Sequence, residues 1–415
     1  MNNEMLSVEE AQHLIVSTVS VLGTETVPLL DAVGRVCAKD VISDMDIAPF
    51  AHSAMDGFAL RSSEIEKASP QTPITLRVIS EIGAGDVFSG KIGEGECVRI
   101  MTGAELPGDA DTVVKYEIVE NTEGDGHTGS IVSFSSPSPV GANIRQAGEE
   151  AHAGEAVMRK GEVVSEAGIG FLAGAGALEI ETYIRPRIAI MATGSELVPP
   201  TEKPGPGHIR ESNSYAMAAC AASAGAHADI LPIVEDTFEA LSDAVSKACE
   251  EYDFVVTTGG AANGDYDYIK KVIESLGELR MSTVNMRPGK AQAFGLVSGT
   301  PVFGLPGNPA AAYCGFQMLI RPGLLKMQGY SNYEPMHIRA VLTTDVPKKD
   351  PRRIYLRSTF VEDADGRFEV TPSKNQSSGL FSVLQRSNCL AVLPEGTEGK
   401  KTGDIVDCIL LGDFR

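Results

Sequence analysis

The chain has 415 residues, which exceeds the roughly 250 to 300 at which one hydrophobic core usually stops growing, so several domains are expected. Its formal net charge of −21 disfavours binding to nucleic acid or to an anionic membrane, because the general field repels polyanions. An anionic small molecule would therefore need a local basic cluster. The apolar segments are short and interrupted by Gly, Pro or charge, so no membrane-spanning segment is predicted.

The first segment predicts an amphipathic helix over residues 7 to 22. Its apolar residues stand at helical spacing, and Ser7 with Glu10 has the form of a capping box. The stretch lacks a basic n-region and a cleavable apolar run, so we expect the protein in the cytoplasm. The seven cysteines are scattered without CxxC spacing and are expected to be buried free thiols.

From residue 25 to about 155 the pattern changes to short Val/Ile runs punctuated by Gly, Pro, Asp and Asn, which predicts a β-rich domain. Residues 156 to 185 contain AGIGFLAGAGALEIE, a small-residue helix leading into a strand. Apolar strands in IAIMATG, HADILPIV, DFVVTTGG and PVFGLPG then alternate with helices near 213–225, 237–251 and 267–276. This alternation predicts a doubly wound α/β domain with a mainly parallel sheet.

After about residue 332 the chain returns to strand-like runs such as HIRAVLTTDV and CLAVLP, separated by charged or Gly-containing turns. This spacing predicts a small C-terminal barrel or sandwich. The expected fold class is therefore multidomain α/β plus β.

Three glycine-bearing loops follow strands of the expected α/β domain, at residues 192–197, 257–260 and 305–309. In an open α/β sheet, ligands bind beyond the carboxyl ends of the strands, and glycine lets the backbone approach a phosphate. Pro306 and Pro309 bracket a rigid turn before a helix whose free N–H groups are expected to face the ligand. One such loop is ordinarily only a turn, so the predicted anion site depends on all three. The residues assigned to it are Gly259, Gly260, Pro306, Gly307, Asn308 and Pro309.

Carboxylates stand close to these loops, at Glu196, Asp236, Asp265 and Asp267. Carboxylates beside a phosphate loop repel the ligand unless a divalent cation joins them, so magnesium is the simplest inference. Asp265 or Asp267 could instead cap the following helix, and this alternative stays open. In MRPGK, Arg287 and Lys290 could meet phosphate oxygens.

The β-rich region carries three further stretches able to hold an oxyanion: SAMDGFA with Asp56, RIMTGA with Thr102, and NIRQAGEE with Arg145. Asp56 stands among small and apolar residues, where burial without a ligand, a cation or backbone donors would be costly. Each stretch alone could be a structural turn.

Taken in order with ATGSEL, TTGG…GDYDY, MRPGKAQAFG and LPGNP, these stretches resemble the bacterial molybdopterin molybdenumtransferase (MoeA-type) family, also represented by the gephyrin E domain. The resemblance covers essentially the whole chain. It implies a discontinuous linker domain at 1–24 and 155–185, a β-rich domain at 25–154, an α/β molybdopterin-binding domain at 186–331 and a C-terminal β-barrel at 332–415. It also implies a homodimer whose cleft is shared between the third domain of one subunit and the second domain of the other.

The activity implied by the resemblance is insertion of molybdate into adenylylated molybdopterin, with release of AMP and with magnesium. Carried over by position, the implied catalytic residues are Asp56, Thr102, Glu196, Asp236 and Asp267. The implied metal ligands are Asp56, Glu150, Glu196 and Asp267. The substrate contacts implied by position are Arg145, Lys290, Pro306 and Pro309. The loops and the basic pair described above add Gly259, Gly260, Gly307, Asn308 and Arg287, and Ser377 and Ser378, in a loop of the C-terminal domain, are candidates for contact with the pterin.

The sequence departs from the family pattern at several positions. Ala262 stands where a serine is common, Arg287 replaces a usual lysine, Ala291 a usual proline, and Glu150 a usual aspartate. In IRESN, Glu211 stands where Asp or Asn is more typical. Loss of the serine hydroxyl would alter oxyanion contacts. A non-catalytic pterin carrier, a tungstate-preferring insertase and an unrelated phosphate-ester enzyme on a similar α/β domain therefore stay open as alternatives.

Overall fold

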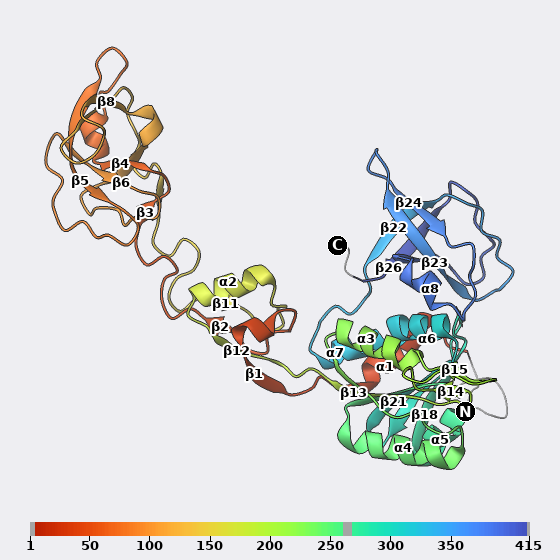
Figure 1. The fold of residues 1–415 in the computed structure, drawn as a ribbon. Coiled ribbons are helices and arrows are strands. Elements are labelled where there is room, and N and C mark those ends of the chain that lie inside the picture. The colour runs from red at the N-terminus through yellow and green to blue at the C-terminus, as the bar shows by residue number, and fades with distance from the viewer. Residues whose placement is uncertain (1–4, 260–267, 413–415) are drawn as a thin grey trace.

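The computed structural model describes residues 5–259 and 268–412, and it is elongated (Figure 1). A β-rich part lies at one end, a small middle part follows, and a three-layer α/β part lies at the other end with a β-barrel beside it. No helix among the described residues is long and apolar enough to cross a membrane.

The α/β part is built on a six-stranded sheet. Its order is β16 (His227–Ile230), β13 (Arg187–Ala192), β17 (Phe254–Thr258), β21 (Thr300–Leu305), β20 (Ala291–Val297) and β18 (Gly277–Thr283). The first four strands are parallel, and β20 pairs antiparallel with both β21 and β18. The fully buried strand β17 reads FVVTT, as expected for a strand covered on both faces. The predicted doubly wound α/β domain is confirmed.

Helices cover both faces of this sheet. On one face lie α4 (Phe238–Glu251) and α5 (Tyr268–Leu276), which bury their apolar stripes against it. On the other lie α1 (Val8–Thr18), α3 (Asn213–Ser223), α6 (Pro309–Gly315), a π-helical segment (Phe316–Ile320) and α7 (Arg321–Met327).

Helix α1 begins with the predicted capping box, in which the Glu10 N–H donates to Ser7 Oγ at 3.2 Å and the Ser7 N–H donates to Glu10 Oε2 at 2.7 Å. The helix does not lie where the resemblance placed residues 1–24. Val8, Ala11 and Ile15 are buried in the α/β core, where α1 packs against the π-helical segment and α7, so α1 completes one face of the α/β part.

The middle part contains two short antiparallel pairs, a 3-10 helix (Leu29–Ala32) and one α-helix. Strand β1 (Thr24–Pro28) pairs with β12 (Glu179–Tyr183), and β2 (Val41–Ile42) pairs with β11 (Ala156–Met158). Helix α2 (Glu166–Gly174) closes a core that includes Val27, Leu29, Cys37 and Leu172. Residues 25 to 42 therefore pack here rather than with the β-rich sheet that follows them.

The β-rich part contains a six-stranded sheet in the order β7 (Thr112–Lys115), β4 (Gly57–Leu60), β6 (Glu96–Ile100), β5 (Ile74–Ile82), β9 (Ile131–Phe134) and β8 (Glu120–Glu123). A separate pair joins β3 (His52–Ser53) to β10 (Ile144–Arg145).

The C-terminal part is a closed barrel, as expected. Its five strands are β22 (His337–Leu342), β23 (Arg353–Glu362), β24 (Phe368–Pro372), β25 (Cys389–Leu393) and β26 (Ile405–Leu410). The sheet runs β23-β24-β22-β26-β25, and β25 pairs back onto β23 to close it. Helix α8 (Phe381–Gln385) follows β24, and β19 (Met286–Arg287) attaches the barrel to the α/β part through β23. All seven cysteines are buried and free, as predicted.

Candidate functional site

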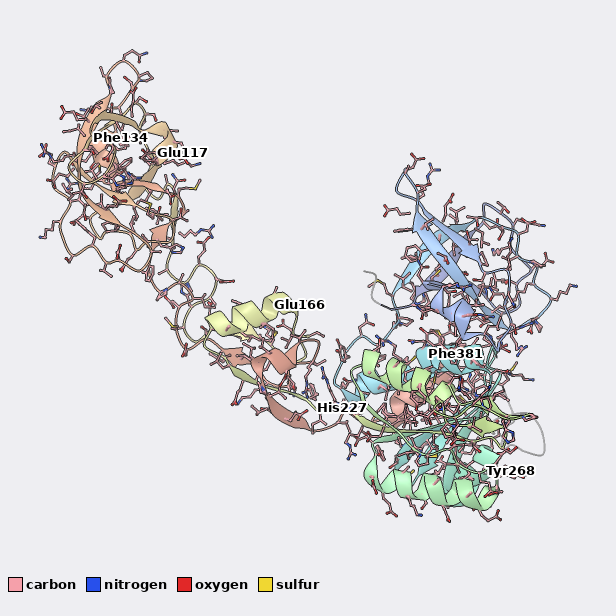
Figure 2. The ribbon with its side chains drawn as sticks, viewed as in Figure 1. Glu117, Phe134, Glu166, His227, Tyr268 and Phe381 are labelled. Carbon is pink, nitrogen blue, oxygen red and sulfur yellow. The ribbon has the colours of Figure 1, made fainter. Side chains whose placement is uncertain are left out.

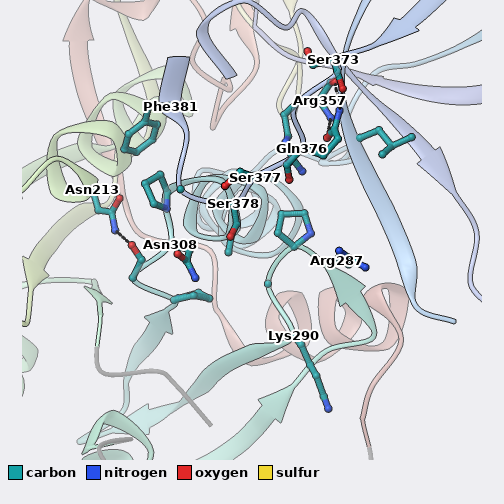
Figure 3. A pocket seen from close by; sticks show the side chains of 18 of the residues that line it. Asn213, Arg287, Lys290, Asn308, Arg357, Ser373, Gln376, Ser377, Ser378 and Phe381 are labelled. Atoms are coloured by element: carbon teal, nitrogen blue, oxygen red, sulfur yellow. Dashed lines mark hydrogen bonds between the residues drawn. The ribbon is translucent and has the colours of Figure 1, made fainter. Parts of the chain in front are cut away.

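A cleft of about 1880 Å³ lies between the α/β part and the barrel. Its floor consists of the loops that follow β13, β17 and β21, which are adjacent strands of the sheet. Its far wall comes from barrel segments between Thr344 and Phe381. Figure 3 shows side chains from both parts facing this space, and Figure 2 shows Phe381, one of the residues that line it, where the barrel meets the α/β part. The three glycine-bearing loops thus meet as the sequence predicted.

The three loops are joined by backbone contacts. The Thr193 N–H donates to Thr258 O at 2.9 Å, and the Gly259 N–H donates to Leu305 O at 3.1 Å. Gly259 has a φ of +93°, and a Cβ at this position would lie 2.1 Å from the backbone oxygen of Thr193. Only glycine fits this crossing, because both the backbone angle and the close approach exclude a side chain.

The first turn of α6 differs from the expectation. Pro309 has no N–H, and the Ala310 N–H donates to the backbone oxygen of Ser378 at 2.8 Å. The barrel loop therefore covers the start of the helix, and the prediction that free N–H groups there face the ligand is wrong. This contact fixes Ser377 and Ser378 at the edge of the cleft, which both residues line.

The cleft is basic although the chain is acidic. Seven basic side chains and four carboxylates line it among the described residues. Arg287 and Lys290 are both exposed, and Arg287 Nη1 donates to Asp350 Oδ2 at 3.1 Å. Arg352 binds the same carboxylate at 2.5 Å, and hydrogen bonds from Arg352 and Arg287 hold the pKa of Asp350 well below its usual range. The local basic cluster required for an anionic ligand is therefore present. Its members are Arg210, Arg287, Lys290, Lys349, Arg352, Arg357 and Lys374.

Arg357 is the most enclosed of these cations, and no motif in the sequence predicted it. Arg357 is 2% exposed. Its Nη1 donates to Tyr355 O at 3.1 Å, and its Nη2 donates to Gln376 O. Its Nε has no hydrogen-bond partner, and burial lowers the pKa of the guanidinium. The signal in the sequence is an arginine two positions after Tyr355 in RIYLRS. Both residues lie on the face of β23 that points away from the barrel core, since Tyr355 is buried in the α/β core and Leu356 in the barrel core.

Two of the predicted acids lie in the cleft. Glu196 is exposed and its carboxylate lies over Gly194, while half-buried Asp236 accepts a hydrogen bond from Thr193 Oγ1 at 3.3 Å. The predictions at Gly260, Asp265 and Asp267 fall outside the described residues, as does the departure at Ala262. Within the described ranges, no group of three or more His, Cys, Asp or Glu side chains is arranged to hold a metal ion.

The other predicted residues gather in the β-rich part. Asp56 Oδ1 accepts from both the N–H and the hydroxyl of Thr102, each at 2.7 Å. The Ala54 N–H donates to Asn143 O, and the Gly103 N–H donates to Ser53 O. The three stretches around Asp56, Thr102 and Arg145 therefore form one cluster, although they lie some ninety residues apart in sequence.

Asp56 is exposed, so the argument from its burial does not hold. Donation from the backbone N–H of Thr102, and then from its hydroxyl, holds the pKa of the Asp56 carboxyl below its usual value. The carboxylate is thus ionised at neutral pH and can only accept hydrogen bonds or bind cations. Arg145 and Glu150 are exposed as well, and none of the four predicted residues of this part lines the cleft of the same chain.

Family models match three consecutive regions of the chain. Residues 6–176 match the MoeA N-terminal region (domain I and II), residues 189–326 match a probable molybdopterin binding domain, and residues 339–411 match the MoeA C-terminal region (domain IV). A curated molybdopterin molybdenumtransferase of Staphylococcus aureus (strain COL) is 35% identical over 98% of this chain and 95% of its own length. The chain belongs to the molybdopterin molybdenumtransferase family.

Other relatives agree with this membership. A molybdopterin molybdenumtransferase of Staphylococcus epidermidis is 34% identical over 98% of this chain and 95% of its own length. The crystal structure of a molybdopterin biosynthesis moeA protein from Pyrococcus horikoshii superposes with a TM-score of 0.84 at 28% identity, covering 98% of this chain and 100% of that one. The chain is accordingly a transferase with a role in molybdenum cofactor biosynthesis.

Proposed function

We propose that the chain inserts molybdate into adenylylated molybdopterin, cleaves the phosphoanhydride and releases AMP. The observation that carries this proposal is the basic cleft in a chain of net charge −21, because a dianionic oxyanion and a pyrophosphate linkage both require local positive charge. Family membership supplies the substrate class.

The cleft residues would have different roles, which depend on their charge and position. Arg287 and Lys290 reach the open side, where they would neutralise the phosphates, and Arg357 would hold the oxyanion from the barrel side. Fixed cations of this kind stabilise charge that builds up on the leaving AMP phosphate. Gly259, Gly307 and Pro306 would let the backbone approach the substrate closely, while Asn308, Pro309, Ser377 and Ser378 line its edge.

We also propose magnesium as the divalent metal. Magnesium is usually held by one or two carboxylates together with substrate phosphates, and Glu196 and Asp236 provide two such carboxylates in the cleft. The resemblance adds Asp267. When bound, the metal would polarise the phosphoryl oxygens. Carboxylates at these positions are otherwise unfavourable beside an anion, which is why the donor set fits a cation.

A homodimer with a shared site accounts for the position of Asp56. Asp56, Thr102, Arg145 and Glu150 lie in the β-rich part, away from the cleft of their own chain (Figure 1). A second copy related by a two-fold axis would bring the cluster of each chain to the cleft of the other. There, ionised Asp56 and Glu150 would join the metal side, and Arg145 would contact the substrate.

Two further proposals concern the chain as a whole. We propose the cytoplasm as its location, because seven buried free thiols suit a reducing compartment. We also propose four domains, with two changes to the predicted boundaries: α1 joins the α/β domain, and residues 25 to 42 join the linker domain. Separate apolar cores in the middle part, the β-rich part and the barrel support this division.

AMP release tests the proposed reaction. Purified protein given adenylylated molybdopterin, molybdate and magnesium is expected to release AMP, with a homologous active enzyme as control. Binding of the substrate without AMP release would instead identify a pterin carrier. Parallel assays with tungstate decide the metal preference, since a tungstate insertase would turn over faster with that oxyanion.

A further inference from the structure

The corner of the cleft at the start of α3 carries two buried polar side chains, Glu211 and Asn213. Glu211 is 4% exposed and Asn213 is 8% exposed, yet both line the cleft. Parallel pairing of β14 (Leu197–Val198) with β15 (Ile209–Arg210) places them there, because the Glu211 N–H donates to Val198 O just after β15 ends.

The amide of Asn213 has a fixed orientation. Its Nδ2 donates to the backbone oxygen of Gly307 at 2.8 Å. Because a carbonyl oxygen only accepts, the amide nitrogen must face Gly307, and Oδ1 must point the other way. That Oδ1 is buried and has no hydrogen-bond partner. A buried acceptor without a donor costs about 1–3 kcal/mol, which a ligand N–H would recover.

Glu211 is a buried carboxylate without a cation. One oxygen accepts from the Ser214 N–H at 2.7 Å, and no ion pair among the described residues includes Glu211. A buried carboxylate is stable only with further donors. These two side chains therefore offer acceptors, while the neighbouring Arg210 donates through Nε to the backbone oxygen of Glu202 at 2.8 Å.

The two kinds of group lie apart in the cleft. Figure 3 shows Asn213 and Phe381 toward one side of the pocket and Arg287, Lys290 and Arg357 toward the other. Phe381, the first residue of α8, lines the cleft and is partly exposed, so its ring is available to a flat ligand. The cleft thus has an anion end and an end suited to a planar ring rich in N–H donors.

We infer that Glu211 and Asn213 recognise the pterin ring through its N3–H and 2-amino groups, an inference that rests on the proposed substrate. Two acceptors match an edge that presents two adjacent donors. The other ring of the substrate, adenine, presents a donor beside an acceptor on its corresponding edge, so it fits this pair poorly. Guanine carries the same two-donor edge as pterin and should compete for the corner.

Binding of free ring compounds tests this assignment without turnover. Pterin is titrated into the full-length protein by calorimetry, beside lumazine, which has an oxygen in place of the 2-amino group. Pterin is expected to bind about 10–100-fold more tightly, as for one hydrogen bond to a charged group. Glu211→Gln should remove this preference while Glu202→Gln, the same change at an exposed residue outside the cleft, should leave it intact.

Three results would overturn the inference: equal binding of pterin and lumazine, an unchanged preference in a folded Glu211→Gln variant, or displacement of pterin by adenosine as readily as by guanosine. Melting curves of both variants show whether they are folded, and Asn213→Ala gives a second reading if Glu211→Gln is unstable. Failure of the proposed reaction can be told apart from failure of this inference. In the first case the protein releases no AMP but still binds pterin more tightly than lumazine.

Discussion

Replacing Gly259 by alanine tests how the cleft floor is built. The substitution places a residue with a side chain at a φ of +93°, which costs about 1–2 kcal/mol. It also places Cβ 2.1 Å from Thr193 O, and a backbone oxygen can move only if β13 moves with it. Overpacking of this kind costs about 1–3 kcal/mol more, so we expect a total loss of about 2–5 kcal/mol.

Gly299→Ala is the matched control. Gly299 has a φ of +87° in the turn before β21, but a Cβ there meets nothing within 4 Å. It should lose only the cost of the backbone angle. Urea unfolding followed by far-ultraviolet circular dichroism compares the two variants, because most of the helices pack on the α/β sheet. Equal losses in the two variants would refute the steric argument.

Three further predictions concern the cleft wall and the buried thiols. Arg357→Met should stay folded, because the loss of its hydrogen bonds is offset by the removal of a buried charge. Its affinity for the substrate, measured by calorimetry, should fall about 10–100-fold. Unchanged affinity would remove Arg357 from the site. Asp350→Asn should lower the free energy of unfolding near neutral pH. Because the pKa of Asp350 is depressed in the folded state, the difference in stability between wild type and variant should shrink as the pH falls below about 4. A difference that does not change with pH would contradict this. Burial raises the pKa of Cys97 and Cys220 to about 12, and all seven cysteines are buried. Ellman's reagent should therefore find almost no reactive thiol in the native protein and all seven after unfolding. Rapid reaction before unfolding would be inconsistent with their burial.

Local pattern was sufficient for much of the fold. Alternating strands and helices predicted the α/β part, and the Ser7–Glu10 spacing predicted the start of α1. The convergence of the loops at Thr193, Gly259 and Pro306 followed from adjacency of parallel strands. These features depend on residues near one another in sequence or on general rules of sheet topology.

The features that were missed depend on contacts between distant segments. Helix α1 packs on the α/β part through partners far along the chain, as in the bridge between Leu6 and Val284. The cover over α6 comes from Ser378, which belongs to the barrel. Arg357 resembles an ordinary strand residue until the barrel packs on the α/β part, whose core includes Tyr355 from the same face of β23.

A subunit-mixing experiment tests the central claim most directly, namely that the cleft of one chain works with the Asp56 cluster of another. Asp56→Ala and Lys290→Ala chains, each expected to fold and to be inactive alone, are co-expressed with different tags and purified as heterodimers. A shared site leaves one intact site in each symmetric pair, so AMP release should return to about half the wild-type rate. Heterodimers as inactive as their two parents would contradict the account.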